Sequence, residues 1–341
     1  MAAFSSTREL TLADDRSVSL GETIGRGCAA TVYRGVVEGA YRVRRPVAVK
    51  ILDALTTEDR DMVVTALSRA ARHAACVDHP NVVATYEFNV HRESQPFIVT
   101  ELVEGRPLGD LMGAFAAVNR RVPLDLALFI ATEVAEGLSG ARDARTIAGG
   151  ILNMTHFDLS TREVLLSRFG EVKVSDFGVG NAVRPGSGVR TLRAVARRVV
   201  TMAPEIASGQ KGDARSDVFS LGIILREMLL GPRFPASTPD ASALELARDG
   251  FVQLMILEPK LPEPLGAILK RAIEIDPADR YPHASSMAYD LHRACLLMGV
   301  ADGRFFLRRA MQEMLPPDDD DEEATQRIAI PEFEFDSHDV T

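Results

Sequence analysis

The stretch THFDLSTREVLLSRFGEVKVSDFG, residues 155–178, decides how the rest of the chain is interpreted. It places one acid, Asp158, in a short loop and a second, Asp176, after two apolar runs separated by a turn at residues 168–170. Two strands joined by a tight turn would hold both acids at the same end of a hairpin. An acid that orients a hydroxyl and an acid that holds a metal are what phosphoryl transfer requires. The alternative is a surface hairpin with two solvated carboxylates, because Asp is usually exposed.

Two features near the start of the chain favour the first interpretation. Gly25 and Gly27 lie between two strand-like runs, where a Gly-x-Gly lets the backbone approach a phosphate closely. The β-branched run at residues 46–50 then ends in Lys50. Alone, the glycines indicate an ordinary turn and the lysine a solvated strand edge. In this order they favour a lysine that reaches the phosphates of a nucleotide.

Composition excludes several classes of protein. The chain has 341 residues, 46% of them hydrophobic, which is ample for one large or two smaller domains. Its three cysteines are far apart and show no metal-ligand spacing, which favours a reducing compartment. No leader pattern and no bilayer-length apolar run are visible, so we expect a cytoplasmic protein without membrane contact.

The net charge of −9 belongs to the end of the chain. Residues 316–341 contain ten acids and one base, so residues 1–315 are neutral overall. No basic surface for nucleic acid is therefore expected. The segment at residues 313–341 is predicted to be an acidic disordered tail, because it cannot bury enough apolar surface to fold.

The pattern along the chain predicts an α+β protein with two lobes and a cleft between them. Residues 1–14 are expected to be a flexible N-terminus. Residues 15–103 are rich in strands and form the predicted small lobe, and residues 104–312 are mostly helical and form the large lobe. The segment Gly105–Pro107 is interpreted as the break between the two patterns.

Together these motifs resemble the eukaryotic-like serine/threonine protein kinases of bacteria, over residues 18–312 or so. The motif set is VAVK, HxD, DFG, APE and DxxSLG in this order. The resemblance implies ATP and magnesium as cofactors, with manganese as an alternative, and a protein substrate or a regulated partner protein. It also implies that Glu205 pairs with Arg280 and that Asp217 supports the catalytic loop.

The resemblance assigns each site residue a role. Asp158 is the expected catalytic aspartate, with Lys50 on the phosphates and Arg162 as a second cation. Asp176 and Glu163 are the expected metal ligands. Residues that would contact the rest of the nucleotide are spread over the small lobe: Gly25, Gly27, Val32, Ala48, Thr100, Glu101 and Val103.

The chain also departs from the family pattern. Ala70 stands where a helix should supply a Glu to pair with Lys50. Phe157 replaces the Arg that reads a phosphorylated loop, and Ser160 replaces a Lys that neutralises the transferred group. Glu163 replaces an Asn, which keeps an oxygen ligand but adds negative charge beside the two acids. Further on, the family's Thr and Tyr are replaced by Arg198 and Thr201.

Two functions therefore stay open. The first is a working kinase that transfers the γ-phosphoryl group of Mg-ATP to a protein Ser or Thr. The second is a pseudokinase, a scaffold or allosteric regulator with weak or no transfer. The tail adds a weaker hypothesis: Thr325 has an apolar residue, Ile328, three positions later, which suits a forkhead-associated domain that reads phosphothreonine. A solvated tail that aids solubility is the alternative.

Overall fold

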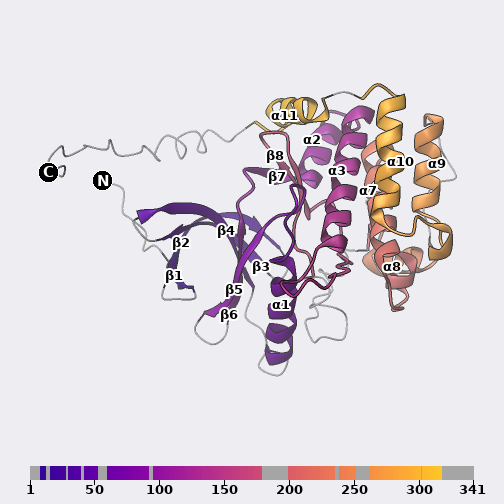
Figure 1. The fold of residues 1–341 in the computed structure, drawn as a ribbon. Helices are drawn as coiled ribbons and strands as arrows, with labels where there is room; N and C mark the ends of the chain where they lie inside the picture. Colours follow the sequence, from indigo (N-terminus) through magenta and orange to yellow (C-terminus); the bar gives the residue numbers. More distant parts are fainter. Residues whose placement is uncertain are drawn as a thin grey trace, which may run out of the picture.

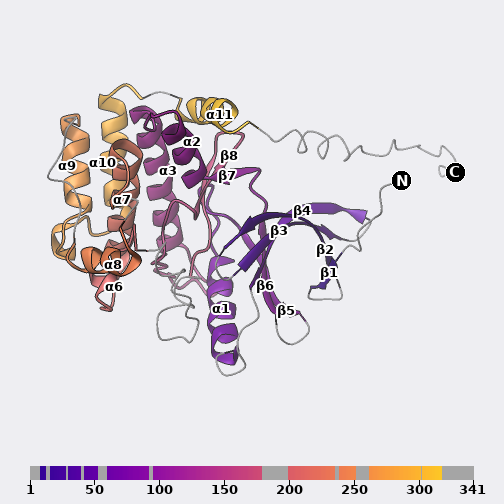
Figure 2. The ribbon, with the colours of Figure 1, turned by 180° about the vertical axis from the view of Figure 1, so that it is seen from behind.

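A computed structural model of the chain has two lobes, a small one built on a curled sheet and a larger helical one (Figures 1 and 2). The ranges that the structure describes are residues 8–12, 16–27, 30–39, 42–52, 60–91, 95–178, 199–234, 238–250, 261–300 and 302–316. The predicted bilobal α+β architecture is confirmed.

The small lobe is a six-stranded antiparallel sheet in the order β1-β2-β3-β4-β6-β5. One helix, α1 (Arg60–Ala74), accompanies it. The strands are β1 (Arg8–Thr11), β2 (Ser17–Arg26), β3 (Ala30–Glu38), β4 (Arg44–Leu52), β5 (Thr85–His91) and β6 (Gln95–Glu101).

The two faces of this sheet have different neighbours. Val47, Val49 and Ile51 of β4 alternate with Ala48 and Lys50, and side chains along a strand point to opposite faces. The odd-numbered residues join an apolar cluster with Phe97 and Val99 of β6. The even-numbered residues therefore lie on the opposite face of the sheet.

The prediction of a flexible N-terminus over residues 1–14 is wrong for residues 8–12. Strand β1 pairs with β2, with Leu10 opposite Val18. Leu10 and Leu12 are buried in the small-lobe cluster because their alternate spacing points both at the same face. The first residues of the lobe thus precede the predicted boundary at residue 15.

The large lobe is helical and packs around α3 (Leu124–Asp143) and α7 (Ala214–Leu230), which lie beside α10 (Ala284–Leu297) in Figures 1 and 2. Helix α7 is buried almost all round, as its apolar composition predicts. The last helix continues two residues past the predicted boundary at residue 312. The other helices are α2 (Leu108–Ala117), α6 (Pro204–Ala207), α8 (Asp240–Arg248), α9 (Glu263–Ala272), the short η3 (Pro277–Asp279) and α11 (Gly303–Met314).

A second sheet, in the order β7-β8-β9, lies where the large lobe meets the small one. Its strands are β7 (Gly105–Pro107), β8 (Val164–Ser167) and β9 (Val172–Val174). Gly105–Pro107 therefore forms a strand, where the sequence pattern indicated only a break. Gly105 is required there because a β-carbon at this position would lie 1.9 Å from the backbone oxygen of Leu166.

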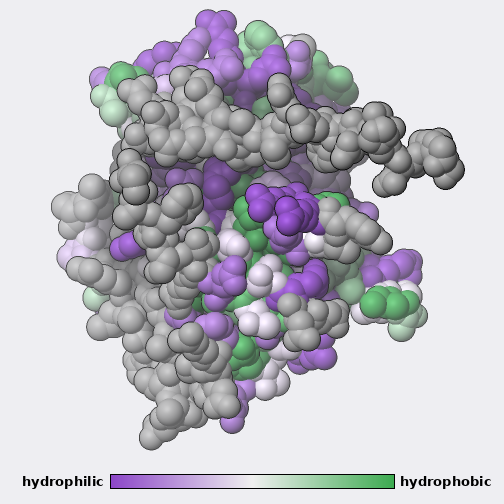
Figure 3. Space-filling view, turned by 90° about the vertical axis from the view of Figure 1, so that its left-hand side faces the viewer, coloured by the Kyte–Doolittle hydropathy of each residue, from purple (hydrophilic) through white to green (hydrophobic). Residues whose placement is uncertain are grey.

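Hydrophilic and hydrophobic residues are interspersed over the described surface on the small-lobe side (Figure 3). Within the described ranges, no helix combines the length and the apolar character needed to cross a membrane.

Candidate active site

The hairpin predicted from residues 155–178 is present. Strands β8 and β9 pair antiparallel, with Val164 opposite Val174. At the open end of the hairpin the amide of Ser175 donates to the backbone oxygen of Glu163 over 2.8 Å. A ring nitrogen of His156 also lies 2.8 Å from the backbone oxygen of Ser175. These contacts bring the loop that carries Asp158 beside the residue that precedes Asp176.

Lys50 and Asp176 meet across the lobes. The Nζ atom of Lys50 lies 2.7 Å from Oδ2 of Asp176, and their side chains are 21% and 31% exposed. Lys50 comes from the sheet face opposite the small-lobe core, and Asp176 from the end of β9. The ammonium group that is predicted to bind phosphate therefore lies beside the carboxylate that is predicted to bind metal.

The predicted lack of a helix carboxylate is also visible. Ala70 of α1 is buried, and a β-carbon placed on Gly178 would lie 3.0 Å from the Ala70 β-carbon. Helix α1 thus packs directly on the segment that follows Asp176. Its single acid, Asp61, belongs to the first turn, more than two turns from Ala70. Lys50 pairs with Asp176, whereas the family pattern would also place a glutamate of this helix beside Lys50.

Three further small-lobe predictions, Val32, Ala48 and Thr100, share the face of Lys50, whereas Glu101 lies opposite Val47 and so belongs to the other face. Val32 lies opposite Lys50 in the sheet, and Ala48 lies opposite Thr100. Residues directly opposite each other point to the same face of a sheet. The strand register therefore gathers Val32, Ala48, Lys50 and Thr100 on one surface, turned away from the apolar cluster of the lobe.

The predicted glycine loop joins β2 to β3 at the edge of this surface. Gly25 lies opposite Val32, and the amide of Gly27 donates to the backbone oxygen of Ala30 over 2.8 Å. The described ranges omit residues 28 and 29. The two glycines therefore lie beside the strand that carries Val32, as the motif predicts.

Ion pairs surround the segment that joins the lobes, residues 101–104. Glu101 pairs with Lys173 of β9 over 2.9 Å. Arg34 of β3 donates to Glu104 over 2.7 Å, and this hydrogen bond holds the pKa of the Glu104 carboxyl below its usual value. Val103 is half-buried between these two acids. The sequence reasoning missed Arg34 and Glu104, since a pair 70 residues apart leaves no local signal.

The loop that carries Asp158 is held by Asp217, as predicted. Its Oδ2 and Oδ1 atoms accept the amides of His156 and Phe157, each over 2.7 Å. Burial raises the pKa of Asp217, and these two amides oppose that shift. Phe157 lies in this loop and has a left-handed backbone φ of 62°. Asp176 also has a left-handed φ, of 63°. Such backbone is unfavourable in non-glycine residues and persists only where surrounding contacts impose it.

Phe177 turns in the opposite direction from Asp176. It is buried in the large-lobe core and meets the His156 ring edge-on, with 4.9 Å between ring centroids. Phe177 thus anchors the segment in the large-lobe core, while the neighbouring Asp176 side chain contacts Lys50.

The other predicted residues of the loop differ in their surroundings. Asp158 is half-buried. The hydroxyl of Ser160 donates to the carboxylate of Glu163, so the residue in the usual lysine position binds the predicted metal ligand. The Arg162 side chain is exposed and has no ion pair within the described part of the chain. The loop thus presents two acids, Asp158 and Glu163, and one cation, Arg162.

Thr201 is a further residue that sequence reasoning undervalued. It is buried, and its hydroxyl donates to the backbone oxygen of Leu159 over 2.7 Å. This bond joins the segment before α6 to the residue that follows Asp158. A cavity of about 10 Å³ lies between the two segments, and Asp158 is one of its lining residues.

Two buried arginines anchor the same segment. Arg280 donates to both oxygens of Glu205 over 2.9 Å, which confirms the predicted pair. Arg233 donates to the backbone oxygens of Val200 and Met202 over 2.9 and 3.1 Å. Burial lowers the pKa of Arg233 to about 10. The predicted replacement at Arg198 falls outside the described residues.

No group of three His, Cys, Asp or Glu side chains suited to a metal converges in the part of the chain that the structure describes. Asp176 and Glu163 are the predicted donors, and carboxylate oxygens suit a hard cation such as Mg²⁺. A magnesium ion bound through one or two carboxylates takes its other ligands from phosphates and water. The donor set therefore fits a metal that arrives with a nucleotide.

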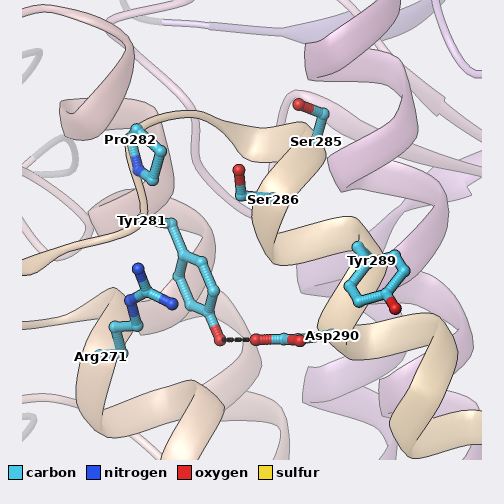
Figure 4. Close-up of a pocket in the computed structure, with 7 residues that line it drawn as sticks. All are labelled: Arg271, Tyr281, Pro282, Ser285, Ser286, Tyr289 and Asp290. Carbon is cyan, nitrogen blue, oxygen red and sulfur yellow. Dashed lines mark hydrogen bonds between the residues drawn. The ribbon is translucent and has the colours of Figure 1, made fainter.

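A separate hollow of about 440 Å³ lies on the large lobe between α9 and α10 (Figure 4). The Tyr281 hydroxyl donates to Asp290 over 2.8 Å, and the Arg271 guanidinium lies 4.3 Å from the Tyr281 ring centroid. Its charged groups balance each other and include none of the predicted site residues.

Comparisons with known proteins agree with this geometry. The sequence profile of the family described as protein tyrosine and serine/threonine kinase matches residues 18–291. A probable serine/threonine-protein kinase of Streptomyces coelicolor is 32% identical over 284 residues, which are 81% of this chain and 39% of that protein. Serine/threonine-protein kinase PknB of Mycobacterium leprae is 30% identical over 278 residues (80% and 42%).

A third relative carries a different name. The tyrosine-protein kinase MasK of Myxococcus xanthus is 32% identical over 266 residues, which are 78% of this chain and 41% of that protein. The chain therefore spans about two fifths of the length of the curated relatives it matches.

Proposed function

This chain belongs to the family of protein tyrosine and serine/threonine kinases, and from that premise we propose that it binds Mg-ATP between its lobes and transfers the γ-phosphoryl group to a Ser or Thr hydroxyl of a protein. The observation that carries the proposal is the 2.7 Å contact between Lys50 and Asp176. An ammonium group and a carboxylate that meet where the two lobes join match a triphosphate and its metal.

Each residue would have a distinct task. Lys50 would bind the α/β-phosphates, and Asp176, which it contacts in this structure, would hold the metal. Val32, Ala48 and Thr100 would contact the base, since they share the Lys50 face. Bound magnesium would offset charge on the β- and γ-phosphates. Glu163 would be its second carboxylate ligand, with the Ser160 hydroxyl keeping that carboxylate in place.

Asp158 would act on the acceptor. Its carboxylate would accept the proton of the substrate hydroxyl as the oxygen attacks the γ-phosphorus, and the bond to the β-phosphate oxygen would break. The hydrogen bonds of Asp217 and Thr201 support this role, because they fix the loop on both sides of Asp158. Arg162 would place its exposed guanidinium near the transferred group.

Intact mass spectrometry tests transfer directly. The chain is incubated with Mg-ATP and a generic Ser/Thr peptide, beside an Asp158→Asn variant. We expect a mass gain of one phosphoryl group on peptide or chain, and its loss in the variant. Phosphate on tyrosine alone would overturn the Ser/Thr assignment. Equal transfer by both proteins would overturn the role of Asp158.

The scaffold function stays as a second candidate, and a specific observation favours it. Ala70 offers no carboxylate to position Lys50, and Ser160 is bonded to Glu163 instead of offering a cation. A clear thermal shift with Mg-ATP, together with no phosphate on any hydroxyl, would support a pseudokinase.

The tail allows a proposal about a partner. Phosphorylated Thr325, with Ile328 three residues later, would suit a forkhead-associated domain. Both residues lie outside the described ranges, so the proposal rests on their sequence. The test measures binding of a phosphorylated tail peptide to such a domain. Binding that persists after Ile328→Ser would contradict the proposal.

A further inference from the structure

One surface of the large lobe combines exposed phenylalanines with arginines. It lies at α11 and the neighbouring turn between β8 and β9, at the top of the lobe in Figure 1. We call it the α11 patch, and it consists of Arg168, Phe169, Arg304, Phe305, Phe306 and Arg308.

Its two parts are in contact although 134 residues or more separate them in sequence. A β-carbon placed on Gly170 would lie 2.3 Å from the backbone oxygen of Arg304, so the turn and the first turn of α11 touch. The Phe305 and Phe306 rings are 5.7 Å apart. Arg308 lies 5.7 Å from the Phe305 ring, and Arg168 lies 4.9 Å from the Phe169 ring.

The aromatic rings make this surface unusual in the molecule. Phe169, Phe305 and Phe306 are 56%, 43% and 40% exposed, and they are the only exposed phenylalanines among the described residues. Exposed apolar area costs about 25 cal/mol per Å². A cluster of exposed rings rimmed by charge is typical of a surface that something covers.

Nearby acids balance the charges on the patch only in part: Arg168 helps to lower the pKa of Glu104, and Asp302 caps the start of α11. Arg304 and Arg308 form no ion pair within the described residues, whereas the adjacent Arg309 pairs with Glu313 over 2.6 Å. The body of the chain, residues 1–315, is neutral overall. The patch is therefore a positive, aromatic surface that suits a negative segment with apolar side chains.

Such a segment follows α11 directly. Six consecutive acids occupy residues 318–323, and the run begins four residues after the end of the helix at Met314. The apolar residues Ile328, Ile330, Phe333 and Phe335 come next. We propose that residues 317–341 bind the α11 patch of the same chain, with the acids on its arginines and the apolar residues on its phenylalanines.

The lengths allow this. The 12 residues of α11 extend over about 18 Å, and six extended residues reach about 20 Å. The acids can thus run back along the helix once the chain reverses. Pro316 and Pro317 stop the helix from running on, because proline cannot continue a helix, so the chain can change direction there.

The test measures whether the patch is already occupied. A fluorescein-labelled peptide of residues 317–341 is titrated by anisotropy against the full chain and against a neutralised chain, in which the six acids at 318–323 are replaced by their amides. A tethered segment acts at millimolar effective concentration, so the intact tail should exclude the peptide. We expect the neutralised chain to bind the peptide at least tenfold more tightly than the wild type.

Matched variants locate the site. In the neutralised chain, Arg304→Glu with Arg308→Glu should weaken peptide binding at least tenfold, and 500 mM salt should do the same. Arg293→Glu reverses another exposed arginine beside an aromatic ring, on α10, and should change binding less than twofold. Phe305→Ser keeps the charge and should weaken binding several-fold at either salt concentration.

Several results would overturn the proposal. Equal binding by wild type and neutralised chain would mean that the tail does not occupy the patch in its own chain. Equal losses from the α11 and α10 variants would mean that the attraction is not local. No peptide binding, with attachment of the chain to phosphatidylserine vesicles instead, would assign the patch to a membrane.

Discussion

The buried pair Glu205–Arg280 allows a prediction with a definite size and pH dependence. The Arg280 side chain is 0% exposed and the Glu205 side chain 8%. Arg280→Met removes both hydrogen bonds to Glu205 and leaves a buried carboxylate with the Ser216 hydroxyl as its remaining side-chain donor among the described residues. Loss of one partner of a buried pair costs about 3–5 kcal/mol. A lowering of the Tm by at least about 6 °C should follow, at roughly 2 °C or more per kcal/mol.

The pH dependence follows from what the arginine does to Glu205. Burial acts to raise the pKa of Glu205, and the hydrogen bonds from Arg280 and Ser216 outweigh it, so the pKa lies below its usual value. In the wild type this group therefore stabilises the fold above its unfolded pKa, and that contribution disappears as pH falls through the folded pKa. Without Arg280 burial dominates, the pKa rises, and protonation relieves the penalty as pH falls.

Urea unfolding at pH 8 and pH 5 measures both effects. The difference in unfolding free energy between wild type and Arg280→Met should be about 3–5 kcal/mol at pH 8 and smaller at pH 5. Adding Glu205→Gln to Arg280→Met should recover stability at pH 8. Arg106→Met breaks an exposed pair and should cost about 0.5 kcal/mol or less. A difference below 1 kcal/mol at pH 8, or one that does not depend on pH, would refute the reasoning.

Three further substitutions follow from the site and the second sheet. Thr201→Val loses the hydrogen bond to the Leu159 carbonyl and should lower the transfer rate about tenfold, with the KM for ATP unchanged. Thr201→Ser keeps a hydroxyl and should retain most activity. Equal transfer rates for Thr201→Val and Thr201→Ser would contradict the role of the hydroxyl. Gly105→Ala should lower the Tm sharply, because its β-carbon would lie 1.9 Å from the Leu166 backbone oxygen. Gly113→Ala has open space around it and should leave the Tm unchanged or slightly higher. Equal melting curves for the two variants would count against the close packing of β7 on β8. Ala70→Glu should raise kcat/KM for ATP in a steady-state assay, because it gives Lys50 a second carboxylate. Ala70→Gln supplies no charge and should not raise it. No gain from Ala70→Glu would contradict the importance of the missing acid.

Local patterns were sufficient for the elements that carry the site. The β-branched run before Lys50, the paired apolar runs at residues 164–166 and 172–174, and the apolar helix α7 all appear as predicted. Their residue spacing reports directly on strand or helix period. The N-terminal strand had a similar signal in Leu10 and Leu12, but a short alternation beside polar residues was outweighed by the expectation that chain ends are loose.

Long-range pairings could not be predicted in this way. Lys50 and Asp176 are 126 residues apart, and the family pattern directs attention to a helix glutamate that this chain lacks. Arg34–Glu104 and Thr201–Leu159 likewise join segments 70 and 42 residues apart. Each depends on how the two lobes and the segment before α6 are placed, which the residue types alone do not specify.

The measurement that tests the central claim most directly is the affinity for ATP, by titration calorimetry with and without magnesium. We expect Lys50→Met to weaken Mg-ATP binding at least tenfold and Asp176→Asn to abolish the benefit of magnesium. Lys270→Met, at an exposed position on α9, should bind as the wild type does. Unchanged affinity in Lys50→Met, or the same magnesium dependence in Asp176→Asn, would contradict a nucleotide site at the contact between Lys50 and Asp176.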